Sequence, residues 1–594
     1  MEQIRGRLSL TQLFEHTTEL SHYTYVVAFF MIIIGLLWGR FKAMHVFATV
    51  VMALILSGFM GIKHIYAAAV NPSILTVMAL IALTGILKKT LPFHRIIDLL
   101  GNSPKSVLIK SSLITATLSG FINNTPVVAL LIPLLKSKAQ EKGWNVGRFL
   151  MPLSFAAVAG GTITLIGTST NLVLNGLMIE NGIQGFAFWD FFLPGLSVTG
   201  AVILTTLLLA PFILNKSEDG AAAAAPSSRQ YTTELKVIPG GSMDGKTVKT
   251  AGLRNLNELF LAEIFRDGNF ISPVTPKERL QANDTLFFTG VLDEVNALLD
   301  LFPNGLKTVE EKFKVDARHD LIEVLVPNNS DLIGRPLKQT NFRARYDAVI
   351  VGVQREGQPI QGKIGRIALQ AGDLLLLSAG INFTARNERE TSLITINQHK
   401  RTSTSPKGRG QYFLPGLLVI VGGALFLHWS LLLSVGLMLL LGIACGITHA
   451  EKLKREFNLE LYALLILSVA FGSAVVEGGH AHFFLEQITL PPDSSAGIVL
   501  LFLLTLLLTN FMTNVSAVAI AFPIAAAMMQ HYQLGHLEVF LPVAFGASGS
   551  FLTPSSYQTH LMVMSPGNYA NQDFLKLGLP VLVVYSAAAL WVLL

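Results

Sequence analysis

Charge and cysteine are both scarce in this 594-residue sequence. Charged residues make up 14% of it and hydrophobic residues 51%, whereas soluble domains carry about 25% charged residues. The one cysteine, Cys445, stands in an apolar run, which excludes an intramolecular disulfide framework and a metal cluster built on cysteines. No cleavable signal sequence is expected, because residues 1–22 are polar and the apolar run after them continues into further spans.

The charges that are present are unevenly distributed. Residues from about 215 to 411 hold most of them, and the flanking regions contain long runs with none. A net charge of +6 in so apolar a chain indicates Lys and Arg in cytoplasmic loops and not nucleic-acid binding. The composition therefore predicts a multi-pass protein of the cell (inner) membrane, surrounded by lipid and without a nucleic-acid partner.

Ten apolar segments are long enough to cross a bilayer core, which needs about 20 residues of helix. They cover residues 23–40, 44–62, 70–88, 148–180, 190–214, 412–428, 430–449, 459–477, 538–564 and 574–594. Two further segments, 106–136 and 496–530, are interrupted by Asn and Thr and predict re-entrant helical hairpins, because non-helical backbone at that depth must be covered by protein or face water. The distribution of Lys and Arg orients five full spans in each half and predicts two inverted halves.

Two polar breaks in the first half recur in the second half. Residues 121–125 (Phe-Ile-Asn-Asn-Thr) match residues 511–515 (Phe-Met-Thr-Asn-Val), so that Phe and the central Asn recur after 390 positions. The polar run 164–171 matches the run 553–560 at nearly the same offset. Secondary transporters built from inverted repeats place their substrate and ion sites at such paired discontinuous helices.

The residue types at the breaks suit an anion that is carried together with a small cation. Free carbonyl, amide and hydroxyl oxygens can coordinate Na⁺, and those at the breaks belong to Asn124, Thr125, Gly167, Asn514 and Ser556. Helix N-termini at the same breaks favour an anion. No Asp, Glu, Lys or Arg occupies the centres of these segments, which argues against a proton antiporter with a buried carboxylate. Small polar residues also serve close helix packing, but two asparagines in hydrocarbon each need a partner.

The polar region between the two halves contains its own repeat, at an offset of 89 residues. Gly245, Arg266 and Asp284 recur as Gly334, Arg355 and Asp373. Alternating apolar residues and Gly- or Asp-containing turns predict strands in both copies. No G-x-G-x-x-G motif follows a strand, so a nicotinamide-type Rossmann site is not expected. Both a dimerisation platform and a ligand sensor remain open as roles for this insert.

Four motifs together resemble the divalent anion:sodium symporter (DASS) family. They are Phe-Ile-Asn-Asn-Thr-Pro (121–126), Gly-Thr-Ser-Thr-Asn-Leu (167–172), Thr-Asn-Val-Ser (513–516) and Ser-Phe-Leu-Thr-Pro-Ser-Ser-Tyr-Gln-Thr (550–559). The match is to the bacterial branch with two TrkA-C (RCK C-terminal) domains between the membrane halves, and it covers nearly the whole chain. The resemblance implies a homodimer, an elevator movement, Na⁺ as the coupling ion and a small regulatory ligand, such as a nucleotide, at the TrkA-C domains.

The resemblance also implies which residues form the site. The substrate-binding residues would be Asn123, Asn124, Thr125, Thr168, Thr513, Asn514 and Tyr557. A first sodium site would comprise Ser119, Asn123, Asn124 and Gly167, and a second one Thr513, Asn514 and Ser556. The family has Ser-Asn-Thr in each hairpin, and the second hairpin here has Val515 where that hydroxyl would stand. This loss favours a small oxyanion such as sulfate over a dicarboxylate.

The expected fold class is a polytopic α-helical membrane protein with two inverted repeats, re-entrant hairpins and broken helices, plus a cytoplasmic α+β insert. The expected boundaries are 1–22 (tail), 23–215 (first half), 216–228 (linker), 229–302 and 315–395 (TrkA-C-like modules), 396–411 (basic linker) and 412–594 (second half). The expected function is sodium-coupled symport of a divalent anion. The alternatives are an anion exporter of the arsenite type, a cation/proton antiporter, and a channel, against which the absence of a T-V-G-Y-G-type filter argues. No nucleophile–base set or metal-ligand cluster indicates an enzyme.

Overall fold

The structure is a computed structural model. In the hydrophobic halves it describes residues 10–38, 43–90, 100–214, 429–449, 459–480 and 491–594, and in the insert most of residues 232–396, apart from 254–258, 291–300, 309–320 and shorter gaps. The predicted span 412–428 and most of both predicted linkers therefore lie outside the described residues.

Helices make up the part of the chain before the insert. They are α1 (Leu10–Leu37), α2 (Ala43–Leu56), α3 (Lys63–Ala69), α4 (Pro72–Thr90), α6 (Pro104–Ser119), α7 (Asn124–Lys142), α8 (Gly147–Gly160), α9 (Ser169–Glu180) and α10 (Phe192–Ile213). The part after the insert is also helical. Its helices are α16 (Leu431–Ala444), α18 (Leu459–Glu477), α20 (Ser494–Phe511), α21 (Asn514–Tyr532), α22 (His536–Ser548), the short η4 (Pro554–Ser556), α23 (Gln558–Met564) and α24 (Asn571–Leu593).

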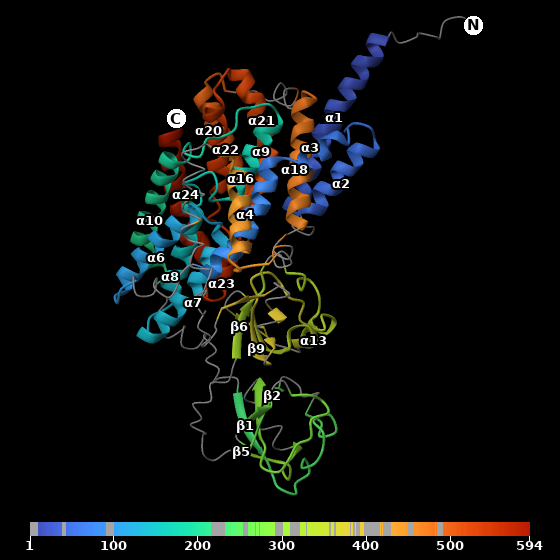
Figure 1. The fold of residues 1–594 in the computed structure, drawn as a ribbon, viewed down its shortest axis with the longest axis vertical. Helices are drawn as coiled ribbons and strands as arrows, with labels where there is room; N and C mark the ends of the chain where they lie inside the picture. Colours follow the sequence, from blue (N-terminus) through green and yellow to red (C-terminus); the bar gives the residue numbers. More distant parts are fainter. Residues whose placement is uncertain are drawn as a thin grey trace, which may run out of the picture.

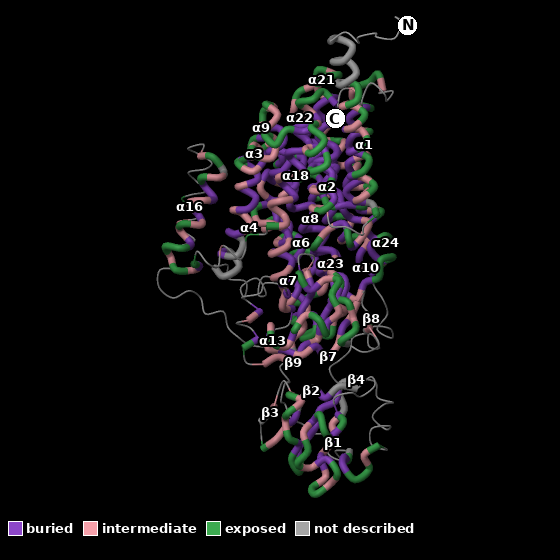
Figure 2. The backbone as a smooth tube through the Cα atoms, turned by 90° about the vertical axis from the view of Figure 1, so that its right-hand side faces the viewer, coloured by how far each residue is buried: buried purple, intermediate pink, exposed green. Residues whose placement is uncertain are grey.

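Within the described residues, six helices are long and apolar enough to cross a membrane. The number is seven if α3 and α4, which meet at a bend of 41°, are counted together as one broken span. Only a third of the apolar stretch is buried in α10 and in α24. The side chains that these helices expose are large and apolar, among them Leu208, Phe212, Val583 and Trp591. Buried residues are concentrated in the middle of the bundle (Figure 2), so the bundle is apolar both inside and out, as a membrane protein requires.

The helix breaks lie where the polar residues predict them. The segments 106–136 and 496–530 are the helix pairs α6–α7 and α20–α21. The predicted spans 148–180 and 538–564 are the broken pairs α8–α9 and α22–α23.

The second predicted span, 44–62, differs from the structure. Its helix α2 ends at Leu56, because the chain turns at Ser57 and Gly58, where Gly58 has the left-handed φ of +80°. Helix α1 also begins earlier than expected, inside the polar tail.

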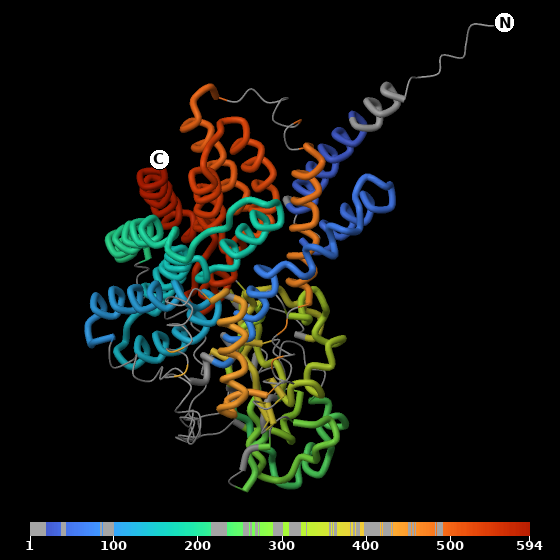
Figure 3. The backbone as a smooth tube through the Cα atoms, turned by 45° about the horizontal axis from the view of Figure 1, so that its top comes forward, coloured from blue at the N-terminus to red at the C-terminus, as the bar shows by residue number. Residues whose placement is uncertain are grey.

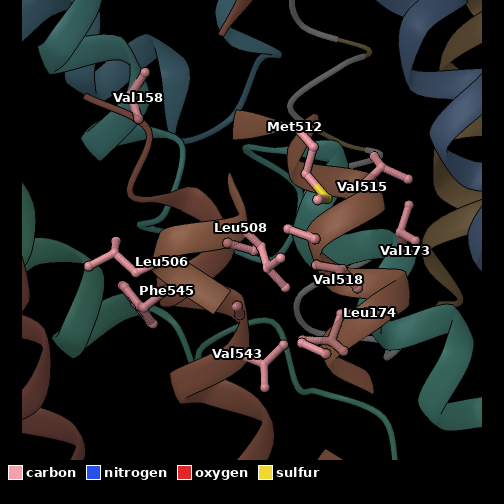
Figure 4. Close-up of a cluster of buried hydrophobic side chains, with 14 of the residues drawn as sticks. Val158, Val173, Leu174, Leu506, Leu508, Met512, Val515, Val518, Val543 and Phe545 are labelled. Atoms are coloured by element: carbon pink, nitrogen blue, oxygen red, sulfur yellow. The ribbon is translucent and has the colours of Figure 1, made fainter. Parts of the chain in front are cut away.

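Corresponding helices of the two halves pack in corresponding ways. Helix α6 packs against α8 as α20 packs against α22, and α10 lies beside α24 (Figure 3). Glycine permits the close approach of α6 and α8: a Cβ on Gly160 would lie 2.4 Å from the Cα of Ala116. The core between the halves is filled by aliphatic side chains from α8, α9, α20, α21 and α22 (Figure 4), so the breaks are held in a packed interior.

The insert contains two antiparallel sheets of the same design. The first comprises β1 (Thr232–Val237), β2 (Leu259–Arg266), β3 (Asn269–Ile271), β4 (Thr285–Gly290) and β5 (Leu306–Thr308), in the order β3-β2-β4-β1-β5. The second comprises β6 (Leu321–Leu325), β7 (Ala348–Arg355), β8 (Gln358–Pro359), β9 (Leu374–Ala379) and β10 (Ile394–Thr395), in the order β8-β7-β9-β6-β10, with α13 (Phe342–Tyr346) before β7. We call residues 232–308 module 1 and residues 321–396 module 2.

The interactions inside module 1 recur in module 2 at the offset of the sequence repeat. Asp284 accepts hydrogen bonds from Arg266, with both distances 2.8 Å, and Asp373 accepts them from Arg355 at 2.7 and 2.9 Å. Each sheet also has a register shift in its second strand, between residues 261 and 263 and between 350 and 352. Module 2 lies against the helical bundle and module 1 lies beyond it (Figure 1).

Candidate functional site

The first break ends one helix and starts another at the same level of the bundle. Helix α6 ends at Ser119, and α7 starts at Asn124 after a non-helical turn. The side chain of Asn123 caps α7 by accepting a hydrogen bond from the backbone N–H of Thr125 at 3.3 Å. The remaining free N–H groups and the helix dipole give this point a partial positive charge.

The broken span between α8 and α9 folds closely against this turn. The hydroxyl of Thr164 donates a hydrogen bond to the carbonyl of Gly120. A Cβ on Gly167 would lie 2.5 Å from the carbonyl oxygen of Gly161, 2.7 Å from that of Ser119 and 3.0 Å from that of Gly120. Three carbonyl oxygens therefore converge on a position that only glycine can occupy.

Unpaired oxygens lie on the segments that meet at this break. Among the described residues, six buried side-chain polar atoms have no hydrogen-bond partner, and three of these are Ser119 Oγ, Asn124 Oδ1 and Asn171 Oδ1. A Cβ on Gly161 would meet Asn124 Oδ1 at 2.8 Å, so the unpaired amide oxygen lies against Gly161, whose carbonyl is one of the three. A buried polar group without a partner costs about 1–3 kcal/mol. A cation with oxygen ligands would remove that cost, and this set of atoms fits one.

The second break has a similar structure, but more of its polar side chains have hydrogen-bond partners. Thr513 caps α21 by accepting a hydrogen bond from the N–H of Ser516 at 3.3 Å. Asn514 Oδ1 accepts hydrogen bonds from the hydroxyls of Thr509 and Ser550, both at 3.0 Å. In the described part of this half, the buried side-chain oxygen without a partner is Ser548 Oγ. The two breaks therefore have the same kind of helix cap, but they differ in which buried side-chain oxygens lack a hydrogen-bond partner.

Two hydroxyl groups at the second break donate hydrogen bonds to backbone carbonyls. The hydroxyl of Thr553 donates to the carbonyl of Asn510 at 3.1 Å, as Thr164 does to Gly120. The hydroxyl of Ser556 donates to the carbonyl of Thr553 at 2.7 Å. Since it closes the short helix η4 in this way, Ser556 has a local partner.

Hydrogen bonds between the halves join the first hairpin to the second broken span. Asn124 Nδ2 donates to the hydroxyl of Tyr557 at 2.7 Å, and that hydroxyl also interacts with Thr168. Thr125 donates to Gln558 Oε1 at 3.0 Å. The structure thus brings four predicted site residues together and adds Gln558. Gln558 could have been proposed as a site residue from the sequence, because it follows Tyr557 in the repeated polar run.

The second hairpin forms a separate cluster. Thr513 and Asn514 bond to residues of their own half, and within the described residues no hydrogen bond links them to residues 123–125. Val515, which stands where the family has a hydroxyl, is buried among apolar side chains (Figure 4).

His560 occupies the place that corresponds to Asn171. One ring nitrogen lies 2.7 Å from the hydroxyl of Ser154 and the other 2.6 Å from the carbonyl oxygen of Ser550. Both nitrogens of this buried ring are therefore engaged, whereas the amide oxygen of Asn171 has no partner.

A pocket opens beside the first break. It is lined by apolar side chains of α4 together with the tip of the first hairpin and the start of α9, and its polar lining residues are Asn123 and Ser169. Asn123, which caps α7, therefore lines a small hollow with mostly apolar walls, which has room for about one water molecule.

Several known proteins with similar sequences are named as transporters. An uncharacterized transporter of Synechocystis (sll0640) is 27% identical over 95% of both chains. Sodium/sulfate cotransporter 1 of Chlamydomonas reinhardtii is 30% identical over 62% of this chain and 43% of its own length. The solved structure of the Alcanivorax borkumensis YdaH transporter aligns with 88% of this chain and 84% of its own, at a TM-score of 0.42 and 12% identity.

A protein family also matches most of the chain. The citrate transporter family matches residues 28–549, which include both helix pairs α6–α7 and α20–α21 and the insert. Membrane-crossing helices and transporter relatives agree with this match and indicate a membrane transporter, not an enzyme. The chain belongs to the citrate transporter family.

Proposed function

We propose that the protein is a sodium-coupled symporter for a divalent anion, with a sulfate-like oxyanion as the first candidate and a dicarboxylate as the second. The observation that carries this proposal is the set of free oxygens at the first break. Ser119 Oγ, Asn124 Oδ1 and Asn171 Oδ1 are buried without partners, on the segments that meet where three carbonyl oxygens converge on Gly167. Oxygen ligands without a carboxylate suit a monovalent hard cation such as Na⁺.

Each polar residue has a role in this proposal. Ser119, Asn123, Asn124 and Gly167 hold the first Na⁺, and Thr513, Asn514 and Ser556 hold the second. The N-termini of α7 and α21 attract the anion, with Asn123, Asn124, Thr125, Thr168, Thr513, Asn514 and Tyr557 as its hydrogen-bonding partners. The side chains that form hydrogen bonds at both breaks are neutral, so the co-transported cations offset the charge of the anion.

Sulfate is favoured over a larger anion by two observations. Three Chlamydomonas relatives with 28–30% identity carry sodium/sulfate cotransporter in their names. Val515 removes a hydroxyl from the second hairpin, which leaves fewer donors for a second carboxylate. The citrate named by the family is accordingly the lesser candidate for this chain.

The wider architecture is part of the proposal. Each chain has two inverted halves, residues 23–215 and 412–594. Two copies of the chain form a homodimer in the inner membrane, and each copy moves its site by an elevator mechanism. The insert is cytoplasmic, with TrkA-C-like modules that bind a small ligand such as a nucleotide. The recurring strand order of modules 1 and 2 and the basic residue Lys136 at the insert side of the bundle support this arrangement.

An exporter of the arsenite type is the second candidate, because it would use the same neutral site without the Na⁺ gradient. A cation/proton antiporter is less well supported, since the groups that bond at the two breaks include no carboxylate.

Reconstitution into liposomes distinguishes these functions. The purified protein is expected to accumulate radiolabelled sulfate under an inward Na⁺ gradient and not under a K⁺ gradient, and unlabelled sulfate should compete. Accumulation of succinate or citrate instead would retain the mechanism and reject the substrate. If no anion moves under a Na⁺ gradient, the sodium coupling is rejected and the exporter becomes the leading function.

A further inference from the structure

Module 2 is packed directly on the helical bundle through one row of its sheet. The row comprises Ile394, Leu325 and Leu374, which face one another across the strands β10, β6 and β9. Leu325 and Leu374 are 1% and 8% exposed and belong to the same apolar cluster as the membrane helices, and Ile394 packs against that cluster. We call these three residues the docking row.

Polar contacts flank the docking row on two helices. Lys136 of α7 forms an ion pair with Glu323, with side chains 13% and 23% exposed. Ser565, directly after α23, donates a hydrogen bond to the carbonyl of Gly372 at 2.8 Å. Gly372 also faces Leu561 of α23: a Cβ on the glycine would lie 3.4 Å from Leu561 Cδ2. The contact therefore holds both α7 and α23.

Module 1 has the same fold but a polar row in the equivalent place. Lys236 pairs across the strands with Lys307 and Thr285, as Leu325 pairs with Ile394 and Leu374. Lys307 is exposed, and two lysines in a row oppose burial against an apolar bundle. Since both sequences support the same sheet, folding of the sheet does not require the apolar row of module 2, and docking explains it.

We infer that module 2 is a reversible latch on α7 and α23, and that the insert acts on the site through this module and not through module 1. The inference rests on the transport function proposed above. Asn124 begins α7 and Gln558 begins α23, so both helices run from the site to the latch. Lys136 is twelve residues after Asn124, which is about 18 Å along a helix. Three apolar side chains, one ion pair and one hydrogen bond make a contact that can open, as interfaces between domains commonly do.

A disulfide can hold the latch closed until it is reduced. The two cysteines are introduced as Gly372→Cys and Leu561→Cys in a Cys445→Ala background. A Cβ on Gly372 would lie 3.7 Å from the Cβ of Leu561. This distance is within the range of about 3.5–4.5 Å for disulfides. Module 1 carries Asn283 at the matching position with φ 67°, so a side chain is tolerated there. Oxidation should lower sulfate uptake at least about tenfold, a coupling typical of allosteric contacts, and reduction should restore it. Each single-cysteine variant serves as a control.

Opening the latch should have the opposite effect. The double substitution Leu325→Lys and Leu374→Thr gives module 2 the residues with which module 1 folds, and we expect uptake about fivefold faster. In module 1, the matched control Lys236→Leu and Thr285→Leu should leave uptake unchanged. Full uptake by the oxidised pair, or equal effects of the two double substitutions, would overturn the latch.

The latch can also be tested apart from transport. When Leu325→Lys and Leu374→Thr are added to the cysteine pair, the disulfide should form more slowly. If the wild type does not transport sulfate, the proposed substrate fails, and this cross-linking rate still decides the latch. Equal rates of disulfide formation would show that the docking row does not hold module 2 in place.

Discussion

Asn124 and Asn514 hold equivalent places in the two halves and have different partners. The amide of Asn124 donates to Tyr557 and leaves its oxygen unpaired, whereas the oxygen of Asn514 already accepts two hydroxyl hydrogens. A ligand that approaches Asn124 gains a free acceptor, and a ligand that approaches Asn514 must first turn two hydroxyls away. The two positions should therefore contribute unequally to cation affinity.

Replacing either asparagine is expected to abolish coupled uptake. Asn124→Ala removes both the cation ligand and the bond to Tyr557, and Asn514→Ala leaves two buried hydroxyls without their acceptor; each should reduce Na⁺-driven uptake about 100-fold or more. Uptake in liposomes measures this, with Asn181→Ala as the control, because Asn181 bonds to Leu177 and Ser473 outside the site. Wild-type uptake by both site variants would disprove the assignment.

Gly161 should be nearly as sensitive as Asn124. A methyl group there would lie 2.8 Å from Asn124 Oδ1 and 2.9 Å from its Nδ2, so Gly161→Ala displaces the amide. Overpacking of this kind costs about 1–3 kcal/mol, which corresponds to a loss of about 5-fold to 150-fold in cation affinity. The Na⁺ concentration for half-maximal uptake should rise accordingly. Gly200→Ala, with no atom within 4 Å of its Cβ, should leave it unchanged.

At the scale of elements, the broken helices are held by hydroxyl-to-carbonyl bonds that cross from one element to another. Thr164 ties the first broken span to Gly120, and Thr553 ties the second to Asn510. A break in the interior leaves backbone groups without helical partners, and these side chains supply some of the missing bonds. The threonines therefore stabilise the non-helical segments that carry the site.

Removing these hydroxyls should loosen the breaks without unfolding the bundle. Thr164→Val and Thr553→Val keep the shape of the side chain and lose one hydrogen bond, at a cost of about 1 kcal/mol each. Both should lower the Tm of the detergent-solubilised protein, and Thr164→Val should also raise the half-saturating Na⁺ concentration. Thr49→Val is the control, because its exposed hydroxyl bonds only to the carbonyl of His45 in its own helix. An unchanged Tm in both site variants would contradict this role.

The positions of the breaks could be predicted because polar residues interrupt apolar runs, as at Asn123 and Thr513. The end of α2 at Leu56 could not, since apolar residues such as Phe59 and Met60 continue beyond the turn and hydropathy does not register a glycine with positive φ. The contact between Thr125 and Gln558 was also beyond sequence reasoning, because it depends on how two distant segments meet. The candidate residues were found by type and spacing, and their partners only by packing.

For the whole molecule, the repeat within the insert indicates two modules but not their different positions. The strand order and the Arg–Asp bonds are common to both modules. What separates them is the docking row, where module 2 has Leu325 and module 1 has Lys236. The same alternation of apolar and polar residues predicts both sheets. The difference between Leu325 and Lys236 therefore indicates docking only once the face of the sheet that contacts the helices is known.

The buried aspartates test whether the two modules act differently on transport. Asp284 is 1% and Asp373 0% exposed, and each accepts hydrogen bonds from an arginine and from a backbone N–H of its own turn. Asp284→Asn and Asp373→Asn should each weaken their module by about 3 kcal/mol, the cost of breaking a buried pair. Limited proteolysis of the insert should detect both losses.

Only one of these two substitutions should change transport. Asp373 follows Gly372, the residue that meets Ser565 and Leu561, so Asp373→Asn should disturb the latch and accelerate sulfate uptake. Asp284→Asn lies in the module whose equivalent row is polar, and it should leave uptake at the wild-type rate although its module is equally weakened. Equal acceleration by both substitutions would mean that module 1 also controls the helices, and that the docking row does not distinguish the two modules.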